Sequence, residues 1–137
     1  MVKNIIRSTD LLKLPSEDAS RADTQTVRDL CDTLDANKSH CVGMAANMIG
    51  VRKRIMAVCT SSGVTVLITP VITGHSGKPF KAQESCLSLI GTHTALRYPI
   101  ISVEYLDRNF KRKKAVFRGM EAQIVQHEAD HFEGILI

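Results

Sequence analysis

The sequence has no tryptophan, two tyrosines and four phenylalanines, so aromatic side chains make up only 4% of the residues. A core must therefore be built mainly from Ile, Leu, Val, Met and Ala, and it can form because 44% of the residues are hydrophobic. No run of about 20 apolar residues occurs, which excludes a transmembrane helix. Residues 1–8 also lack the apolar segment of a secretory signal. We therefore expect a cytoplasmic protein without a membrane partner.

Cysteine pairs at CxxC spacing are also missing. The four cysteines are Cys31, Cys41, Cys59 and Cys86. Because nothing in the sequence indicates export, we expect reduced thiols rather than disulfides. Any one of them is then free to bind a metal ion.

The chain has no strong excess of one charge and no recognised nucleic-acid-binding motif. Its 137 residues carry a formal net charge of +4, with a basic run at Lys111–Lys114. Such a run is typical of a solvated turn or strand end, so we expect no sequence-specific nucleic-acid partner. The length predicts a single domain over residues 1–137.

Two helices are predicted, one early and one late. From about Asp23, apolar residues recur at spacings of three and four, which indicates a helix that packs on a sheet and ends near residues 37–39; they are Val27, Leu30, Cys31 and Leu34. The late helix runs through residues 119–133, and Gly134 is a plausible stop.

The strand signals lie between these helices. Residues 55–59 and 64–69 read as a hairpin around a Ser-Ser-Gly turn, with Pro70 closing the second strand and His75 in the loop that follows. Residues 100–106 and 113–117 form a second strand pair, and residues 135–137 a short final strand or apolar tail. This order predicts an α+β fold with largely antiparallel β-sheets packed around a central C-terminal helix, plus one N-terminal helix.

The late helix carries a His-Glu-x-x-His pattern. His127 and His131 are four residues apart, so they lie on one helix face, one turn apart, and can bind one metal ion. Glu128 between them can act as a general base on water. A catalytic metal needs a third ligand and an open position, and the pattern alone also fits an ordinary amphipathic helix.

Two further segments allow both a structural and a functional interpretation. Small residues crowd residues 41–50, so Gly43 and its neighbours form either a tightly packed turn or the wall of a substrate groove. Met120 and Ile124 share the helix face of the two histidines, so they are either pocket walls or plain core.

Three segments together resemble the bacterial peptide deformylases. Residues 41–48, CVGMAANM, resemble that family's motif Gly-x-Gly-Leu-Ala-Ala-x-Gln. Residues 84–88, ESCLS, resemble Glu-Gly-Cys-Leu-Ser, and residues 126–131, QHEADH, match Gln-His-Glu-x-Asp-His in full. The resemblance covers nearly the whole chain.

The resemblance implies a metal centre and a reaction. It makes Cys86 the third ligand beside His127 and His131, around one divalent ion. Ferrous iron is the metal it implies, although purified protein could carry Zn²⁺, Ni²⁺ or Co²⁺. The reaction is hydrolysis of the formyl group of N-formylmethionyl nascent peptides, with Glu128 moving the proton.

The same resemblance assigns the remaining site residues. The backbone N–H of Leu87 would stabilise the developing oxyanion, while the second donor of the family, a glutamine, is replaced here by Met48, whose thioether cannot donate. Val42 and Gly43 from the first motif join Met120 and Ile124 as the expected substrate-binding residues. A candidate replacement donor is Gln123, and Glu84 is expected to pair with Arg97.

Three functions from different classes fit these residues. The first is a deformylase whose activity is reduced by Met48. The second is a non-catalytic paralogue that binds metal and a formyl peptide or a partner, and the third is a zinc peptidase or amidase with another substrate. The basic balance also suggests weak, salt-sensitive ribosome association.

Overall fold

Seven strands and three α-helices build the fold in the computed structural model, which describes residues 1–137. The helices are α1 (Thr9–Leu12), α2 (Thr24–Ala36) and α3 (Gly119–Phe132), with short 3₁₀ turns at Arg21–Asp23 (η1) and Ala46–Ile49 (η2). The strands are β1 (Gly43–Ala45), β2 (Ile55–Thr60), β3 (Gly63–Ser76), β4 (Phe80–Glu84), β5 (His93–Arg97), β6 (Ile100–Leu106) and β7 (Arg112–Arg118). None of the helices is long and apolar enough to cross a membrane.

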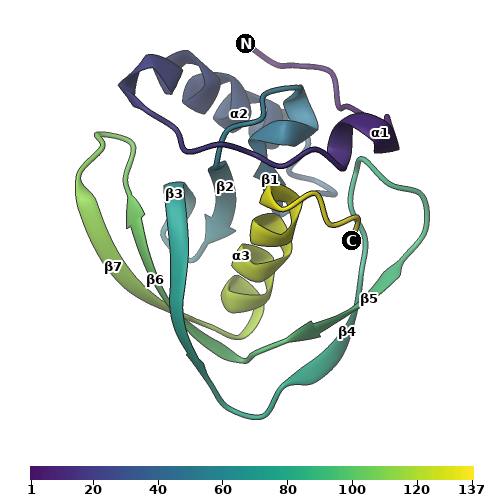
Figure 1. Cartoon of the computed structure of the whole chain (residues 1–137), viewed down its shortest axis with the longest axis vertical. Coiled ribbons are helices and arrows are strands. Elements are labelled where there is room, and N and C mark those ends of the chain that lie inside the picture. Colours follow the sequence, from purple (N-terminus) through teal and green to yellow (C-terminus); the bar gives the residue numbers. More distant parts are fainter.

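The strands form two antiparallel sheets around α3. The larger sheet has the order β1-β2-β3-β6-β7, and β4 and β5 form a separate two-stranded hairpin. In Figure 1, α3 runs through the middle of the molecule, with the strands curving around it and α2 on the far side of β1 and β2. The predicted α+β fold, with antiparallel sheets packed around the C-terminal helix, is therefore confirmed.

Strand β2, between β1 and β3, is buried on both faces over residues 55–58, which explains why it reads as a continuous apolar run. Ile55 and Ala57 face the cluster that contains the apolar residues of α2. Met56 and Val58 point the other way, into the cluster that contains those of α3. Alternate side chains of one strand thus join the two helices to the same sheet.

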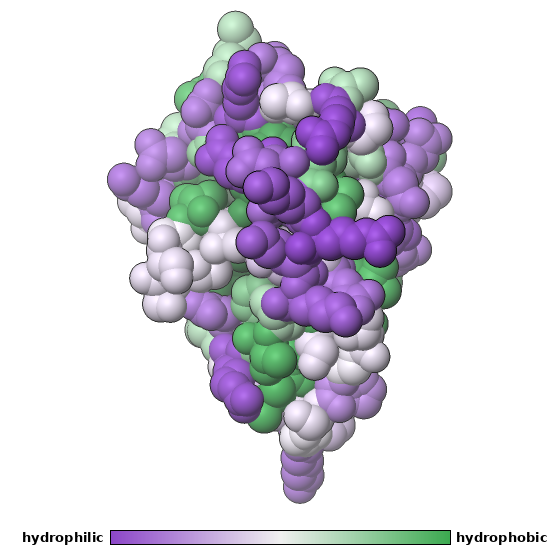
Figure 2. Space-filling model, turned by 90° about the vertical axis from the view of Figure 1, so that its left-hand side faces the viewer, coloured by the Kyte–Doolittle hydropathy of each residue, from purple (hydrophilic) through white to green (hydrophobic).

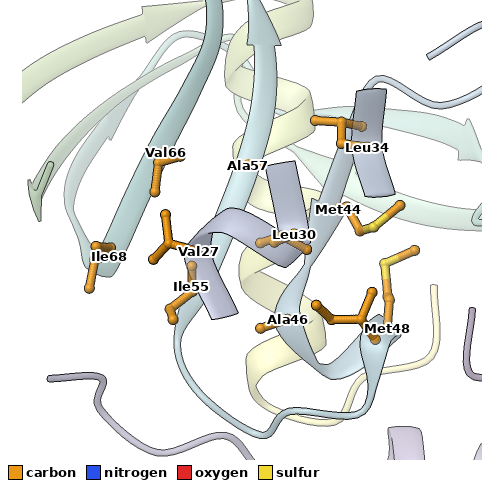
Figure 3. Close-up of a cluster of buried hydrophobic side chains, with 11 residues drawn as sticks. Val27, Leu30, Leu34, Met44, Ala46, Met48, Ile55, Ala57, Val66 and Ile68 are labelled. Atoms are coloured by element: carbon orange, nitrogen blue, oxygen red, sulfur yellow. The ribbon is translucent and has the colours of Figure 1, made fainter. Parts of the chain in front are cut away.

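The predicted early helix matches α2. Its apolar stripe is buried, with Val27 at 3% exposure and Leu30 and Leu34 at 0%, and it packs against β2 residues (Figure 3). Cys31 lies at the edge of this cluster and is only half-buried. Full burial of a Leu or Val side chain contributes about 1.5–3 kcal/mol, so this stripe is sufficient to hold the helix on the sheet.

Two predictions for the middle of the chain were wrong. The strand expected to end at Pro70 continues as β3 to Ser76, because a register shift between Ile68 and Val71 leaves the proline outside the regular ladder. His75 therefore lies in a strand, where its ring stacks on Tyr98 with centroids 3.7 Å apart.

The segment between β3 and β6 and the last three residues were also compared with the expected elements. The hairpin β4–β5 was not expected, since its strands are short and carry several polar residues. Residues 135–137 form no strand, so of the two alternatives for this segment the apolar tail is the one present.

The basic run lies at the start of β7, as a solvated strand. Lys111–Lys114 are all exposed, and Lys114 pairs with Glu104 at 3.4 Å while Lys113 lies 3.9 Å from Asp107. Figure 2 shows that hydrophilic side chains dominate the face of the molecule that includes this strand. Such exposed pairs contribute about 0–1 kcal/mol each, so this strand is held by its pairing with β6 rather than by its charges.

The end of α3 is closed by the glycine that the sequence indicated. Gly134 has a φ of +74°, its N–H donates to the His131 carbonyl at 3.1 Å, and the Ile135 N–H donates to the Asp130 carbonyl at 3.1 Å. This pair of bonds is the Schellman arrangement. A Cβ at Gly134 would also lie 2.1 Å from the Lys13 carbonyl oxygen, so the turn packs directly against the N-terminal segment.

We therefore expect Gly134→Ala to destabilise the protein. The left-handed conformation alone costs a non-glycine residue about 1–3 kcal/mol, and the clash with Lys13 adds to this. Gly74→Ala is the matched control, because a Cβ there meets nothing within 4 Å and the change should shift the free energy of unfolding by at most about 1 kcal/mol. Urea denaturation measures both, and equal midpoints for the two variants would contradict this account.

Candidate metal centre

One face of α3 presents two imidazoles to the same point in space. The Nε2 atoms of His127 and His131 lie 3.1 Å apart, and both rings are buried. Two nitrogen ligands of a tetrahedral ion, each about 2.0–2.1 Å from it, lie about 3.3 Å apart. The spacing of the two rings therefore suits one shared metal ion.

A thiol from the loop after β4 completes the cluster. The Sγ of Cys86 and the nitrogens of the two histidines all lie within 4.8 Å of one another. Cys86 comes 41 residues before His127 in the sequence, so only the fold brings these groups together. One thiolate and two neutral imidazoles form a donor set that Zn²⁺ and Fe²⁺ both accept, with a fourth position left for water or substrate. The residues present thus fit a catalytic metal.

His127 is oriented by a buried carboxylate. Its Nδ1 lies 2.9 Å from the Glu84 Oε1, which leaves Nε2 directed at the cluster. Glu84 also accepts from the Arg97 guanidinium at 2.7 and 3.0 Å and from the Gln123 amide at 2.8 Å. Arg97 in turn donates to Asp130 at 2.7 Å. The expected Glu84–Arg97 pair is therefore present.

The two rings have opposite proton affinities. Burial lowers the pKa of His127, but hydrogen bonds to Cys86 and Glu84 outweigh it and raise the value to about 10. Burial and the charge of His127 lower the pKa of His131 to about 3. Without a metal ion, His127 holds a proton that a metal ion must displace, whereas His131 is neutral and offers a free lone pair.

Glu128 is buried without a partner for one of its oxygens. It is 4% exposed, its Oε1 has no hydrogen-bond partner, and burial raises its pKa to about 7. The backbone of β1 approaches it closely, since a Cβ at Gly43 would lie 2.9 Å from Glu128 Oε2 and 2.6 Å from Ile124 Cγ2. An unpaired carboxyl group that titrates near neutrality can both take up and release a proton.

The cluster opens into a cavity of about 350 Å³. All the expected site residues except His131, which lies deeper, line this cavity: Cys86, His127, Glu128, Leu87, Met48, Val42, Gly43, Met120 and Ile124. Met120 is 66% exposed and is therefore wall rather than core, whereas Ile124 is 7% exposed and serves as both.

The donors available for an oxyanion are few. Leu87 lines the cavity, and its N–H donates to no other group in the structure. Met48 is 1% exposed, and its Sδ lies 4.0 Å from the Cys86 Sγ. The amide of Gln123 is already bonded to Glu84 at 2.8 Å, so it does not replace the missing donor.

Several supporting residues received no role from the sequence. Asn47 is buried and donates to the His131 carbonyl at 3.0 Å, and Gln126 binds both the N–H and the carbonyl of Tyr98, at 2.9 and 2.8 Å. Asp130 pairs with Arg97, as described above. All three lie inside the motifs quoted above, which was the available signal.

Comparisons with known proteins agree with this geometry. The family model for polypeptide deformylase matches residues 3–137. A peptide deformylase of Clostridium beijerinckii is 52% identical over 137 residues, covering 100% of both chains, and one of Pelotomaculum thermopropionicum is 37% identical over 82% of this chain and 74% of its own.

Solved structures give the same result. The class I type b peptide deformylase of Acinetobacter baumannii with bound Met-Ala-Ser superposes with a TM-score of 0.88 at 27% identity, over 99% of this chain and 97% of that one. The same enzyme bound to actinonin gives 0.88 at 29% identity, over 99% and 95% of the two chains. The motifs, the site geometry and these relatives agree, and the chain belongs to the peptide deformylase family.

Proposed function

We propose that this chain hydrolyses the N-formyl group of formylmethionyl peptides. The observation that supports this most strongly is the convergence of Cys86, His127 and His131 within 4.8 Å, at a cavity that also contains the unpaired Glu128. A relative of the same fold binds Met-Ala-Ser, which has the sequence of a deformylated N-terminus. In the proposed reaction the C–N bond of the formamide breaks, a C–O bond forms, and formate and a free amine leave.

Cys86, His127 and His131 would hold one divalent ion, for which we propose Fe²⁺. When bound, the ion acts as a Lewis acid that polarises the formyl carbonyl and makes water more acidic. Glu84 fixes the His127 ring through the 2.9 Å bond to Nδ1, so that its Nε2 points to the ion.

Glu128 is the proposed general base and acid. Its carboxylate takes a proton from the attacking water and then delivers it to the leaving amine nitrogen. Its raised pKa, about 7, suits both steps near neutral pH. Burial also keeps bulk water from competing for the proton.

The substrate would lie in the cavity of about 350 Å³ described above. Met120 and Ile124 form an apolar wall suited to a methionine side chain, and Val42 and Gly43 line the same cavity at the start of β1. The Leu87 N–H would donate to the formyl oxygen as it gains negative charge.

The thioether at position 48 favours a second candidate function. Because Met48 lies beside Cys86 and cannot donate a hydrogen bond, a non-catalytic paralogue that binds metal and formyl peptide without turnover also fits the site. Binding of a formyl peptide with no turnover by any metal form would select this candidate over the first.

The proposed function is tested by assaying formyl-Met-Ala-Ser with iron-loaded protein prepared without oxygen. We expect release of formate and of the free amine, and we expect Glu128→Gln to reduce the rate by about 10²–10⁴-fold because the proton transfer is lost. Metal content should be unchanged in this variant. Glu121→Gln, on the same helix but outside the cavity, is the control. No release by the metal-loaded wild type would reject the proposal.

Met48→Gln should increase turnover. The new amide would supply a second donor to the oxyanion, and one such donor is worth up to about 10²–10³-fold in kcat. Met48→Leu removes the sulfur without adding a donor and should give no gain. If both variants keep the wild-type kcat, position 48 does not limit the reaction.

Glu84→Gln should weaken both the fold and the metal site. The change leaves the Arg97 charge, 5% exposed, with Asp130 alone, and losing one partner of a buried ion pair costs about 3 kcal/mol or more. Loosening His127 should lower metal affinity about 10–100-fold. Glu104→Gln, in an exposed pair, should change stability by less than about 1 kcal/mol. Thermal unfolding and chelator competition measure both effects, and wild-type values in both would refute the role assigned to Glu84.

A further inference from the structure

The sulfur of Met48 lies beside the cluster of candidate metal ligands formed by Cys86, His127 and His131. Met48 belongs to the buried cluster between α2 and the sheet, as does Met44 (Figure 3). Of these two methionines, only Met48 also lines the cavity of the metal ligands. Its Sδ lies 4.0 Å from the Cys86 Sγ.

From this geometry we propose that Met48 makes a weak additional contact to the metal centre, beside the position left for water or substrate, and that its thioether shifts the site's preference toward soft ions. The inference rests on the proposed function for the identity of the other three ligands. It goes beyond it because it changes which ions the site selects.

Cys86 Sγ donates a weak hydrogen bond to Met48 Sδ at 4.0 Å, and this separation is also compatible with a shared ion. Two sulfur ligands of a tetrahedral ion, each about 2.3 Å from it, lie about 3.8 Å apart. The 4.0 Å between Met48 Sδ and Cys86 Sγ is slightly longer, as expected when one sulfur binds at a greater distance. Methionine has three rotatable side-chain bonds, so its sulfur can adjust its position toward an ion bound at Cys86.

The resulting donor set has a known chemical preference. Two imidazoles, one thiolate and one long thioether contact are the ligands of sites that hold copper, and thiolates and thioethers together favour soft ions over hard ones. A glutamine at the same position would offer only oxygen and nitrogen atoms. The thioether therefore replaces a hydrogen-bond donor for the substrate with a soft contact for the metal.

The other cysteine at the cavity does not compete for this role. The thiol of Cys41 donates to the Gly43 carbonyl at 3.0 Å and is not part of the three-residue cluster. Met120 also lines the cavity but is 66% exposed, whereas Met48 is buried with its Sδ 4.0 Å from the Cys86 Sγ.

The test compares the affinities of the full chain for Cd²⁺, a soft ion, and for Zn²⁺, by chelator competition. We expect Met48→Leu to lower the ratio of Cd²⁺ to Zn²⁺ affinity about tenfold, the smaller of the losses typical when support for a metal site is removed. Met44→Leu removes a thioether from the same cluster but not from the cavity, and it should leave the ratio unchanged. Met48→Gln should lower the ratio as Met48→Leu does, and serves in its place if the leucine variant folds poorly.

X-ray absorption of the Cd²⁺-loaded protein gives a second readout. Two sulfur neighbours in the wild type and one in Met48→Leu would support the proposal. One sulfur in both proteins, with equal affinity ratios, would overturn it. Failure of the wild type to bind Cd²⁺ while it binds Zn²⁺ would overturn this inference alone, whereas Cd²⁺ binding with the expected ratios but no formyl-peptide cleavage by the iron-loaded protein would overturn the proposed function alone.

Discussion

A single buried carboxylate, that of Glu84, connects the metal cluster to the rest of the fold. It accepts hydrogen bonds from Arg97 on the partner strand and from Gln123 on α3, and it orients the His127 ring at 2.9 Å. Hydrogen bonds from His127 and Arg97 outweigh the effect of burial and lower its pKa to about 2, so it stays charged. Because a buried charge is costly unless its partners are present, this carboxylate holds the hairpin against the helix.

A second set of contacts fixes α3 along its length. Asn47, just after β1, binds the carbonyl of His131 at 3.0 Å, and Gln126 holds the backbone of Tyr98 between β5 and β6. Gly43 allows β1 to lie directly against Ile124 and Glu128. The groups that position the site are therefore spread over most of the chain, which explains why its short motifs lie far apart in the sequence.

Much of this could be read from the sequence because it depends on local spacing. The i, i+4 histidines, the apolar stripe of α2 and the strand pair β6–β7 follow from periodicity alone. The Cys86 ligand came only from resemblance, since no local pattern connects it to α3. Pro70 was wrongly expected to end a strand, because an irregularity in the pairing of β3 with β6 accommodates it. The hairpin β4–β5 was not predicted, because its strands are short and carry several polar residues. The resemblance placed Met48 and Cys86 at the same site, but no pattern in the sequence indicated that their sulfur atoms lie 4.0 Å apart.

The residues of the metal site come from two kinds of segment, a helix and a loop. His127, Glu128 and His131 move together on one helix, while Cys86 lies in the segment between β4 and β5. An ion held by both would close a covalent-like bridge across the 41 residues from Cys86 to His127, restricting the unfolded chain much as a crosslink does. The supply of metal would then govern how long the native molecule persists, in addition to whether it can act on a substrate.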